Sequence, residues 1–213
     1  MVDLDILEYV AANSSPPEPV QVDLQQATQE RTGRSSIMQI GHDQAVMMET
    51  LVRATRARRA IEVGTFTGYS ALAIARGLPP DGKLLCCDTN AEWGEIAREY
   101  WRRAGLDERI ELKIGPALET LRALPSVEQF DFAFIDADKP AYYDYYEELL
   151  PRMSKGGLLL ADNTLSNRGV VNPNIHDDAT EAMRTFNPRL ASDARVRVSL
   201  LTVGDGVTLI EKL

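Results

Sequence analysis

The sequence of 213 residues contains only two cysteines, Cys86 and Cys87, and they are adjacent. Neighbouring residues in a strand point to opposite faces, so these two thiols are poor disulfide partners. We expect buried, reduced thiols and therefore a cytoplasmic location. Histidine is equally scarce, with only His42 and His176, and no Cys/His cluster exists. The sequence therefore predicts no structural zinc site.

Basic side chains and long apolar runs are also scarce. The chain has 23 Lys and Arg against 32 Asp and Glu, which gives a formal net charge of −9. Such a surface repels phosphate backbones, so we expect no nucleic-acid partner, and we interpret the run RATRARR at residues 53–59 as a solvated helix end. No apolar stretch approaches the length of a membrane span, and the acidic N-terminus MVDLDILEYV is not typical of a secretory signal.

What is present is typical of one soluble domain covering residues 1–213, with 44% hydrophobic and 26% charged residues. Apolar periodicity predicts helices over about 3–12, 19–32, 42–58, 69–77, 91–104, 116–123, 140–153 and 177–190. It predicts strands at 60–63, 83–87, 109–114, 130–135, 158–161, 196–203 and 207–211. Residues 1–37 form an N-terminal helical extension, and Gly204-Asp205-Gly206 predicts a closing antiparallel hairpin.

This alternation of strands and helices predicts an α/β fold with a doubly wound, mainly parallel, seven-stranded sheet. In such sheets, ligands bind outside the carboxyl ends of the strands. Gly64, Asp88, Asp136 and Asp162 stand at four of these ends. We therefore expect the binding and catalytic residues at these strand ends.

The first strand runs into the segment EVGTFTGYS, in which Gly64 and Gly68 bracket a turn into a helix. The G-x-x-x-G spacing differs from the G-x-G-x-x-G pattern of dinucleotide-binding enzymes. Glu62 disfavours a diphosphate and suits a cationic group, while Asp88 at the next strand end suits ribose hydroxyls. Together they indicate S-adenosylmethionine, although each feature alone is also explained by a helix cap or a solvated loop acid.

The next two strand ends carry a set of oxygen ligands. Asp136 ends FDFAFID, and Asp162 and Asn163 end GGLLLADN. Two carboxylates and an amide oxygen suit Mg²⁺, with Mn²⁺ or Ca²⁺ as alternatives, although Asp and Asn also favour turns. Lys139, three residues after Asp136, is a candidate base for deprotonating an acceptor hydroxyl. Its alternative interpretation is a surface lysine paired with Asp138.

Five segments carry a resemblance to a known family: IEVGTFTGYSALAIA, GPALETL, FDFAFIDADKPAYYDYY, GGLLLADNTL and GDGVTL. With these segments in order, the sequence resembles the class I S-adenosylmethionine-dependent, cation-dependent O-methyltransferases of the caffeoyl-CoA type, and more distantly catechol O-methyltransferase. The resemblance implies a Rossmann-like methyltransferase fold, a homodimer, and methyl transfer to one hydroxyl of a catechol-like small molecule.

The resemblance also assigns roles by position. It implies cofactor contacts by Ile40, Glu62, Gly64, Thr65, Ser70, Asp88, Ala117 and Asp138. The implied metal ligands are Asp136, Asp162 and Asn163, and the implied catalytic residues are Lys139 and Asp136. Asn167 matches a position near the acceptor, which Lys139 and Met38 would also contact.

The acceptor region departs from the family pattern. Ser166 stands where many relatives carry Trp, and residues 1–37, which help to shape the acceptor pocket in this family, show little similarity. The net charge of −9 favours a small phenolic acceptor over a caffeoyl-CoA-type thioester. A metal-independent methyltransferase, an NAD-dependent oxidoreductase and a non-catalytic cofactor-binding module are the competing interpretations.

Overall fold

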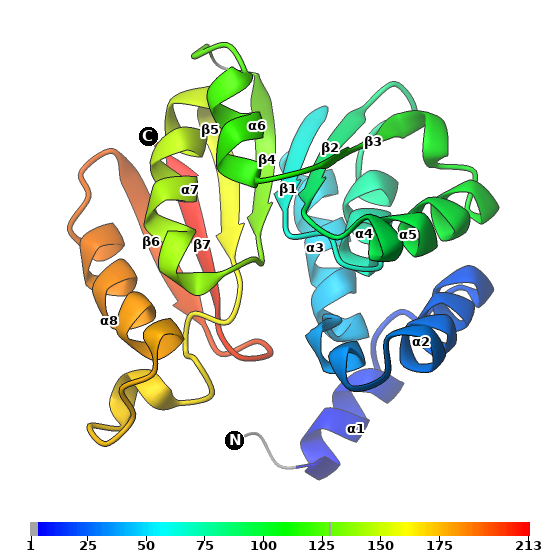
Figure 1. The fold of residues 1–213 in the computed structure, drawn as a ribbon, viewed down its shortest axis with the longest axis horizontal. Coiled ribbons are helices and arrows are strands. Elements are labelled where there is room, and N and C mark those ends of the chain that lie inside the picture. The colour runs from blue at the N-terminus through cyan, green and yellow to red at the C-terminus, as the bar shows by residue number, and fades with distance from the viewer. Residues whose placement is uncertain (1–3, 128) are drawn as a thin grey trace.

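One mixed sheet organises the molecule. The computed structural model describes residues 4–127 and 129–213, and within this part seven strands pair in the order β3-β2-β1-β4-β5-β7-β6 (Figure 1). The strands are β1 (Arg59–Val63), β2 (Lys83–Asp88), β3 (Ile110–Ile114), β4 (Phe130–Ile135), β5 (Met153–Ala161), β6 (Val196–Leu201) and β7 (Val207–Lys212). Strands β1 to β5 pair in parallel, and β7 is antiparallel to both β5 and β6. The predicted sheet with its closing hairpin is confirmed.

Helices cover both faces of this sheet. The α-helices of the described residues are α1 (Leu4–Ala12), α2 (Pro19–Thr32), α3 (His42–Ala54), α4 (Tyr69–Gly77), α5 (Ala91–Arg103), α6 (Ala117–Ala123), α7 (Tyr142–Leu149) and α8 (Asp178–Ala191), and all but α1 contribute to the packing around the sheet. Alternation along the strands sorts side chains between two cores, since successive residues point to opposite faces. In β4, Phe132 and Phe134 pack with α3, α4 and α5, whereas Ala133 and Ile135 pack with α6, α7 and α8.

Several elements begin or end at residues other than those that the sequence predicts. Helix α3 stops at Ala54 rather than near residue 58, and Arg56 has a φ of 55° where the chain turns into β1. Strand β5 begins at Met153, five residues earlier than the apolar run indicates, and includes Gly156 and Gly157. The segment 33–41 contains a 3-10 helix, Gly33–Met38, where the sequence predicts only a loop.

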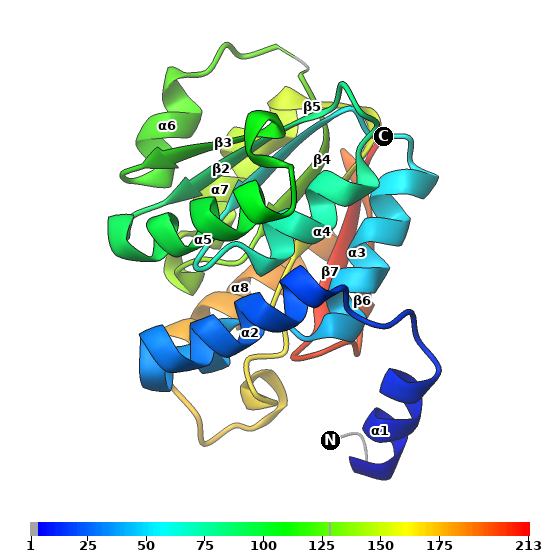
Figure 2. The same cartoon turned by 90° about the vertical axis from the view of Figure 1, so that its right-hand side faces the viewer.

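The N-terminal helices reach the carboxyl end of the sheet. The buried hydroxyl of Thr28 on α2 donates to that of Thr67, 2.8 Å away in the loop after β1. His42, at the start of α3, contacts the Tyr69 hydroxyl at 2.9 Å and the Ser15 carbonyl at 2.8 Å. Helix α1 lies apart from the sheet beyond α2 (Figure 2). None of the helices in the described ranges is long and apolar enough to cross a membrane.

Candidate active site

The loop between β1 and α4, the glycine cradle, turns at Gly64 and Gly68. Gly64 has a φ of 88°, and a Cβ atom there would lie 1.9 Å from the Asp136 carbonyl oxygen. Only glycine allows this approach between the end of β1 and the end of β4. Gly68, with a φ of 83°, is the N-cap of α4, and a Cβ there would press against the Trp101 ring. Both glycines of the predicted turn are thus required by the backbone.

Asp88 fixes this loop from the end of β2. Its Oδ2 accepts the amides of Thr65 at 2.9 Å and Phe66 at 2.7 Å, and its Oδ1 accepts the Asn90 amide at 2.8 Å. The side chain lies beside the cradle as predicted. It already has a structural function there, and its contact with a ribose stays a prediction.

Glu62 is fully buried at the end of β1. Its Oε2 lies 3.5 Å from the Cys86 sulfur, and its Oε1 has no hydrogen-bond partner. Burial raises the pKa of Glu62 to about 8, although the Ser70 and Thr65 hydroxyls act in the opposite direction. A buried acceptor without a donor is costly, so this oxygen fits a ligand that brings one. A ligand ammonium supplies such a donor together with the charge that a carboxylate prefers.

Asp136 and Asp162 end neighbouring strands side by side. The Asp136 amide donates to the Val63 carbonyl at 2.8 Å, and the Asp162 amide donates to the Ile135 carbonyl at 3.0 Å. The Asp162 carboxylate is buried, and it accepts the Gln44 side-chain amide at 2.7 Å and the Asn163 backbone amide at 2.7 Å. The predicted juxtaposition of these strand ends is confirmed.

The two carboxylates form an acidic pair with raised pKa values. Burial, and then the charge of Asp136, raise the pKa of Asp162 to about 7. Burial raises the pKa of Asp136, while the Lys139 ammonium opposes the rise. The buried carboxylate of Asp162, the half-buried carboxylate of Asp136 and the amide of Asn163, which has a φ of 53°, are a donor set that suits a hard cation. The described residues contain no group of three or more His, Cys, Asp and Glu that could hold a metal, so the metal itself stays a prediction.

Lys139 points at the same strand end. Its Nζ donates to Asp136 Oδ1 at 3.1 Å and to the Tyr142 hydroxyl at 2.7 Å. The buried Tyr142 hydroxyl also lies 3.2 Å from the Ile135 carbonyl and 3.1 Å from the Asp162 carbonyl. Tyr142 therefore links the lysine to both acidic strand ends. The alternative pairing of Lys139 with Asp138 is wrong.

Sequence reasoning missed Tyr142 and Gln44. Tyr142 belongs to a run of tyrosines that the sequence assigns to the core or to a dimer contact. Gln44 lies beside apolar core positions on α3 and is 118 positions from Asp162. Neither residue belongs to a local motif. The available signal for Gln44 was its position next to Ala45 and one helical turn before Met48, on the core face of α3.

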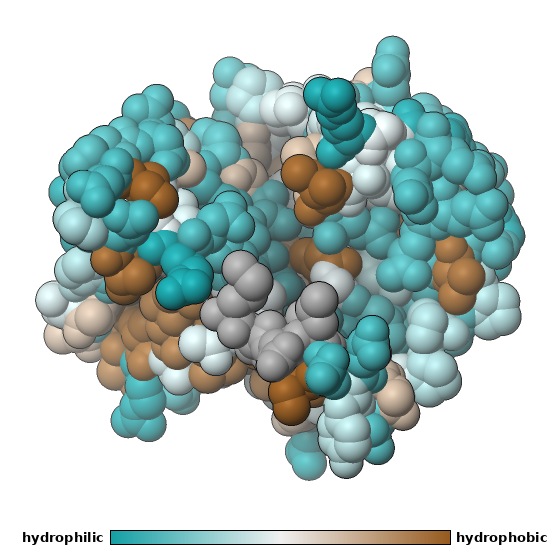
Figure 3. All heavy atoms as spheres, turned by 90° about the horizontal axis from the view of Figure 1, so that it is seen from below, coloured by the Kyte–Doolittle hydropathy of each residue, from teal (hydrophilic) through white to brown (hydrophobic). Residues whose placement is uncertain are grey.

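The remaining predicted site residues lie at different places around this edge of the sheet and make separate contacts. Asp138 is exposed and accepts the Tyr145 hydroxyl at 2.6 Å, and the exposed Asn167 donates its backbone amide to Asp205 at 2.8 Å. Met38 is exposed at the end of the 3-10 helix, Ile40 is half-buried against the core, and Ala117 is buried at the start of α6. Their ligand contacts stay predictions. Figure 3 views this end of the molecule, where most of the surface is hydrophilic and hydrophobic residues lie near the middle and in a patch at the lower left.

A sequence profile of a family described as O-methyltransferase matches residues 11–213. The chain belongs to this O-methyltransferase family. A caffeoyl-CoA O-methyltransferase of Populus kitakamiensis is 35% identical, over 97% of this chain and 92% of its own. The catechol O-methyltransferase domain-containing protein 1 of Mus musculus is also 35% identical, over 99% of this chain and 81% of its own.

Solved structures of O-methyltransferases have the same fold. TomG from Streptomyces achromogenes, in complex with S-adenosylmethionine, superposes with a TM-score of 0.89 at 28% identity, covering 98% of this chain and 96% of its own. An O-methyltransferase from Bacillus cereus, in complex with S-adenosylhomocysteine, gives a TM-score of 0.88 at 28% identity, covering 98% and 97%. The predicted class, an S-adenosylmethionine-dependent O-methyltransferase, is confirmed, and the oxidoreductase interpretation is set aside.

Proposed function

We propose that this O-methyltransferase transfers the methyl group of S-adenosylmethionine to one hydroxyl of a vicinal diphenol, with a divalent cation bound at the acceptor side. The observation that carries the proposal is the meeting of Asp136, Asp162 and Lys139 beside the glycine cradle. One edge of the sheet thus combines an acidic pair, an amine and a place for a cationic cofactor.

The cofactor fits the first two strand ends. Glu62, with its unpartnered buried oxygen, would receive the methionine ammonium, and Gly64 lets the ends of β1 and β4 approach each other beside it. Asp88 would accept a ribose hydroxyl while it continues to hold the loop amides. When bound, S-adenosylmethionine supplies an electrophilic methyl group on a sulfonium.

The cation fits the next two strand ends. Asp136, Asp162 and Asn163 would hold it, with Mg²⁺ the best match to an all-oxygen set and Mn²⁺ or Ca²⁺ as alternatives. When bound, such an ion lowers the pKa of a hydroxyl and orients it. A cation bound beside Lys139 would favour loss of the ammonium proton to solvent, and the neutral amine would then accept the acceptor's hydroxyl proton. Gln44 would hold one carboxylate oxygen of Asp162 in place during the proton transfer.

The acceptor is proposed to be a small phenol, such as a catechol. Relatives named caffeoyl-CoA O-methyltransferase favour a thioester as the second candidate. The two candidates differ in charge, since coenzyme A carries phosphates and this chain is strongly acidic. A panel that contains both substituted catechols and caffeoyl-CoA separates them.

The test is methyl transfer from S-adenosylmethionine to that panel, with Mg²⁺ and with excess EDTA. We expect turnover that disappears with EDTA and returns with added metal. Mn²⁺ binding, followed by electron paramagnetic resonance, should be lost in Asp162→Ala and retained in Asp131→Ala, a control at the other end of β4. Turnover that excess EDTA does not change would contradict the proposed metal and indicate a metal-independent methyltransferase. Cofactor binding without turnover on any acceptor would indicate a binding module.

A further inference from the structure

The loop after β5 carries a backbone conformation that needs support. Ser166, Asn167 and Arg168 are consecutive and have φ values of 49°, 50° and 66°. Residues other than glycine adopt this left-handed conformation at a cost, and a run of them persists where the surroundings hold the chain. The loop begins directly after Asp162 and Asn163, so its support bears on the candidate acceptor site.

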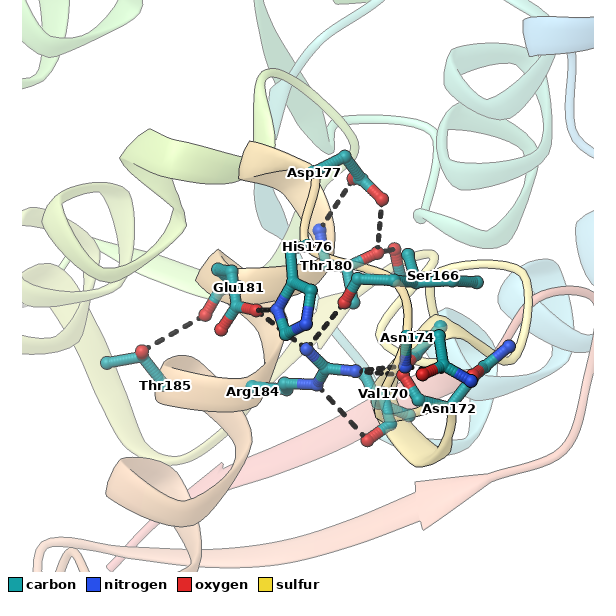
Figure 4. Close-up of polar contacts among 12 residues, drawn as sticks. Ser166, Val170, Asn172, Asn174, His176, Asp177, Thr180, Glu181, Arg184 and Thr185 are labelled. Atoms are coloured by element: carbon teal, nitrogen blue, oxygen red, sulfur yellow. Dashed lines mark hydrogen bonds and ion pairs between the residues drawn. The ribbon is translucent and has the colours of Figure 1, made fainter.

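One arginine of α8 holds the outer part of this loop (Figure 4). Arg184 donates from Nε to the Val170 carbonyl at 3.4 Å and from Nη1 to the Ile175 carbonyl at 2.7 Å. Its Nη2 donates to the Gly169 carbonyl at 2.7 Å and also to the Asn172 carbonyl. A planar guanidinium has five N–H groups in a fixed fork, which lets a single side chain bind four backbone oxygens.

The arginine is itself held in place. Glu181, one turn earlier on α8, pairs with Arg184 at 2.7 Å and with His176 Nδ1 at 2.9 Å (Figure 4). The Arg184 side chain is 22% exposed, so its bonds to the loop are partly shielded from water. Hydrogen bonds from a charged donor in such a place are stronger than neutral ones.

A second support lies nearer the metal residues. The buried Thr180 hydroxyl bonds the Ser166 hydroxyl at 2.9 Å and donates to Asp177 Oδ2 at 2.8 Å. Because Thr180 uses its proton on Asp177, Ser166 is the donor to Thr180. A Cβ at Gly169 would lie 2.6 Å from the Thr180 oxygen, so the loop packs directly on α8. The Ser166 position is therefore part of the loop's anchoring.

We propose that Arg184 is a positioning residue for the methyl acceptor. By binding the carbonyls of residues 169–175, it fixes the adjoining left-handed segment, including Asn167, beside Asp162 and Asn163. This inference rests on the proposed function. It concerns the acceptor and not the cofactor, because the loop follows β5, whereas the cradle follows β1, and β4 lies between these strands.

The variants separate positioning from general stability. Arg184→Met keeps the apolar stem and removes every donor, and Arg184→Lys keeps the charge with fewer donors. Arg189→Met is the matched control, since Arg189 lies on the same helix and its guanidinium stacks over the Tyr143 ring at 4.7 Å. The acceptor is a catechol with one ring substituent, so that methylation gives two distinguishable isomers.

We expect Arg184→Met to raise the acceptor KM by roughly tenfold or more and to change the isomer ratio, because small misplacements of a bound reactant are costly. Arg184→Lys should fall between wild type and Arg184→Met. S-adenosylhomocysteine affinity, measured by calorimetry, should stay within about twofold of wild type, since its site is untouched. Arg189→Met should match wild type in every measurement.

Hydrogen exchange of residues 163–175 tests the same proposal without turnover. Arg184→Met should exchange faster there than wild type and Arg189→Met, with the strands of the sheet unchanged. An unchanged isomer ratio and KM, or unchanged exchange, would overturn the positioning role. A wild-type protein that methylates no acceptor would contradict the proposed function, and exchange alone would then decide whether Arg184 holds the loop.

Discussion

Glu62 is a buried residue whose protonation is strongly linked to folding. Its pKa is about 8 in the folded protein against 4.5 for an ordinary glutamate, so the fold keeps a proton that the unfolded chain releases between these values. The folded state therefore binds more protons, and the free energy of unfolding falls as the pH rises from about 4.5 to 8. For the cofactor-free protein this loss is on the order of a few kcal/mol.

Glu62→Gln should reduce this pH dependence, because glutamine resembles the protonated acid and does not titrate, and the remaining slope comes from groups such as Asp162. Urea unfolding between pH 5 and pH 8, without cofactor or metal, measures the slope. Glu119→Gln, an exposed residue in the first turn of α6, is the control and should keep the wild-type slope. Equal slopes in wild type and Glu62→Gln would show that Glu62 is ionised in the fold.

Lys139 carries the proposed proton transfer. Lys139→Met should reduce turnover by about 10²- to 10⁴-fold, the usual range for loss of a general base. S-adenosylhomocysteine affinity should not change, because the amine contacts Asp136 and Tyr142 rather than the cradle. Tyr142→Phe, which removes one partner of the amine and leaves the amine itself, should have a smaller effect. Full activity in Lys139→Met would assign the proton to another base.

Among the structural elements, α2 is attached to the cofactor loop through one buried hydroxyl pair. Thr28→Val or Thr67→Val should each cost about 1–3 kcal/mol, because each leaves the other hydroxyl buried without a partner. The double variant should cost less than the sum of the two. Urea unfolding of the four proteins measures this coupling, and additive losses would show that the pair contributes nothing.

The order of the elements could be predicted from the sequence, whereas some of their ends could not. Apolar runs at 60–63 and 83–87 mark strands that are buried on both faces, and the structure has them there. The start of β5 carries no such signal, because Ser154, Lys155, Gly156 and Gly157 precede its apolar part. Met153 pairs with Phe130 and Leu158 pairs with Phe132, so residues 154–157 form an irregularity between two paired positions, which is a tertiary effect.

The candidate site likewise has parts that the sequence predicts and parts that it does not. Asp136 and Asp162 could be placed together because parallel strands that are neighbours in the sheet end at one edge. The carbonyl contacts of Arg184 could not be predicted, since they depend on the path of an irregular loop. Gln44 reaches its partner only through the packing of α3 against the sheet. Local sequence patterns thus locate the strand ends. The contacts of the side chains that lie between these ends can be seen only in the folded structure.

At the scale of the whole molecule, the arginines of residues 53–59 lie at the opposite end of the sheet. Arg53, Arg56, Arg58 and Arg109 line a hollow of about 690 Å³ there. Arg53 pairs with Glu49 at 2.7 Å, and Arg58 pairs with Asp81. These charges are therefore partly balanced where α3 ends, which agrees with the interpretation of a solvated helix end.

The predicted homodimer is tested by light scattering. We expect a mass of twice 23.6 kDa. Exposed apolar side chains on α1, with Tyr9 67% and Ile6 52% exposed, offer a surface that a second copy would cover. Tyr9→Glu should then shift the protein toward the single-chain mass, while Val127→Glu, far from α1 in the sequence and also exposed, should not. A single-chain mass for wild type would contradict the prediction.

The turn at residues 204–206 has a consequence for how the protein is made. Thr164 and Leu165 donate their amides to the carbonyls of Gly206 and Asp205, and β7 inserts between β5 and β6. Strand β5, which Asp162 follows, therefore keeps one unpaired edge until residues 207–212 have been made and have paired with it. In a chain that folds during synthesis, the β5 end of the candidate site is therefore completed later than the β1 end.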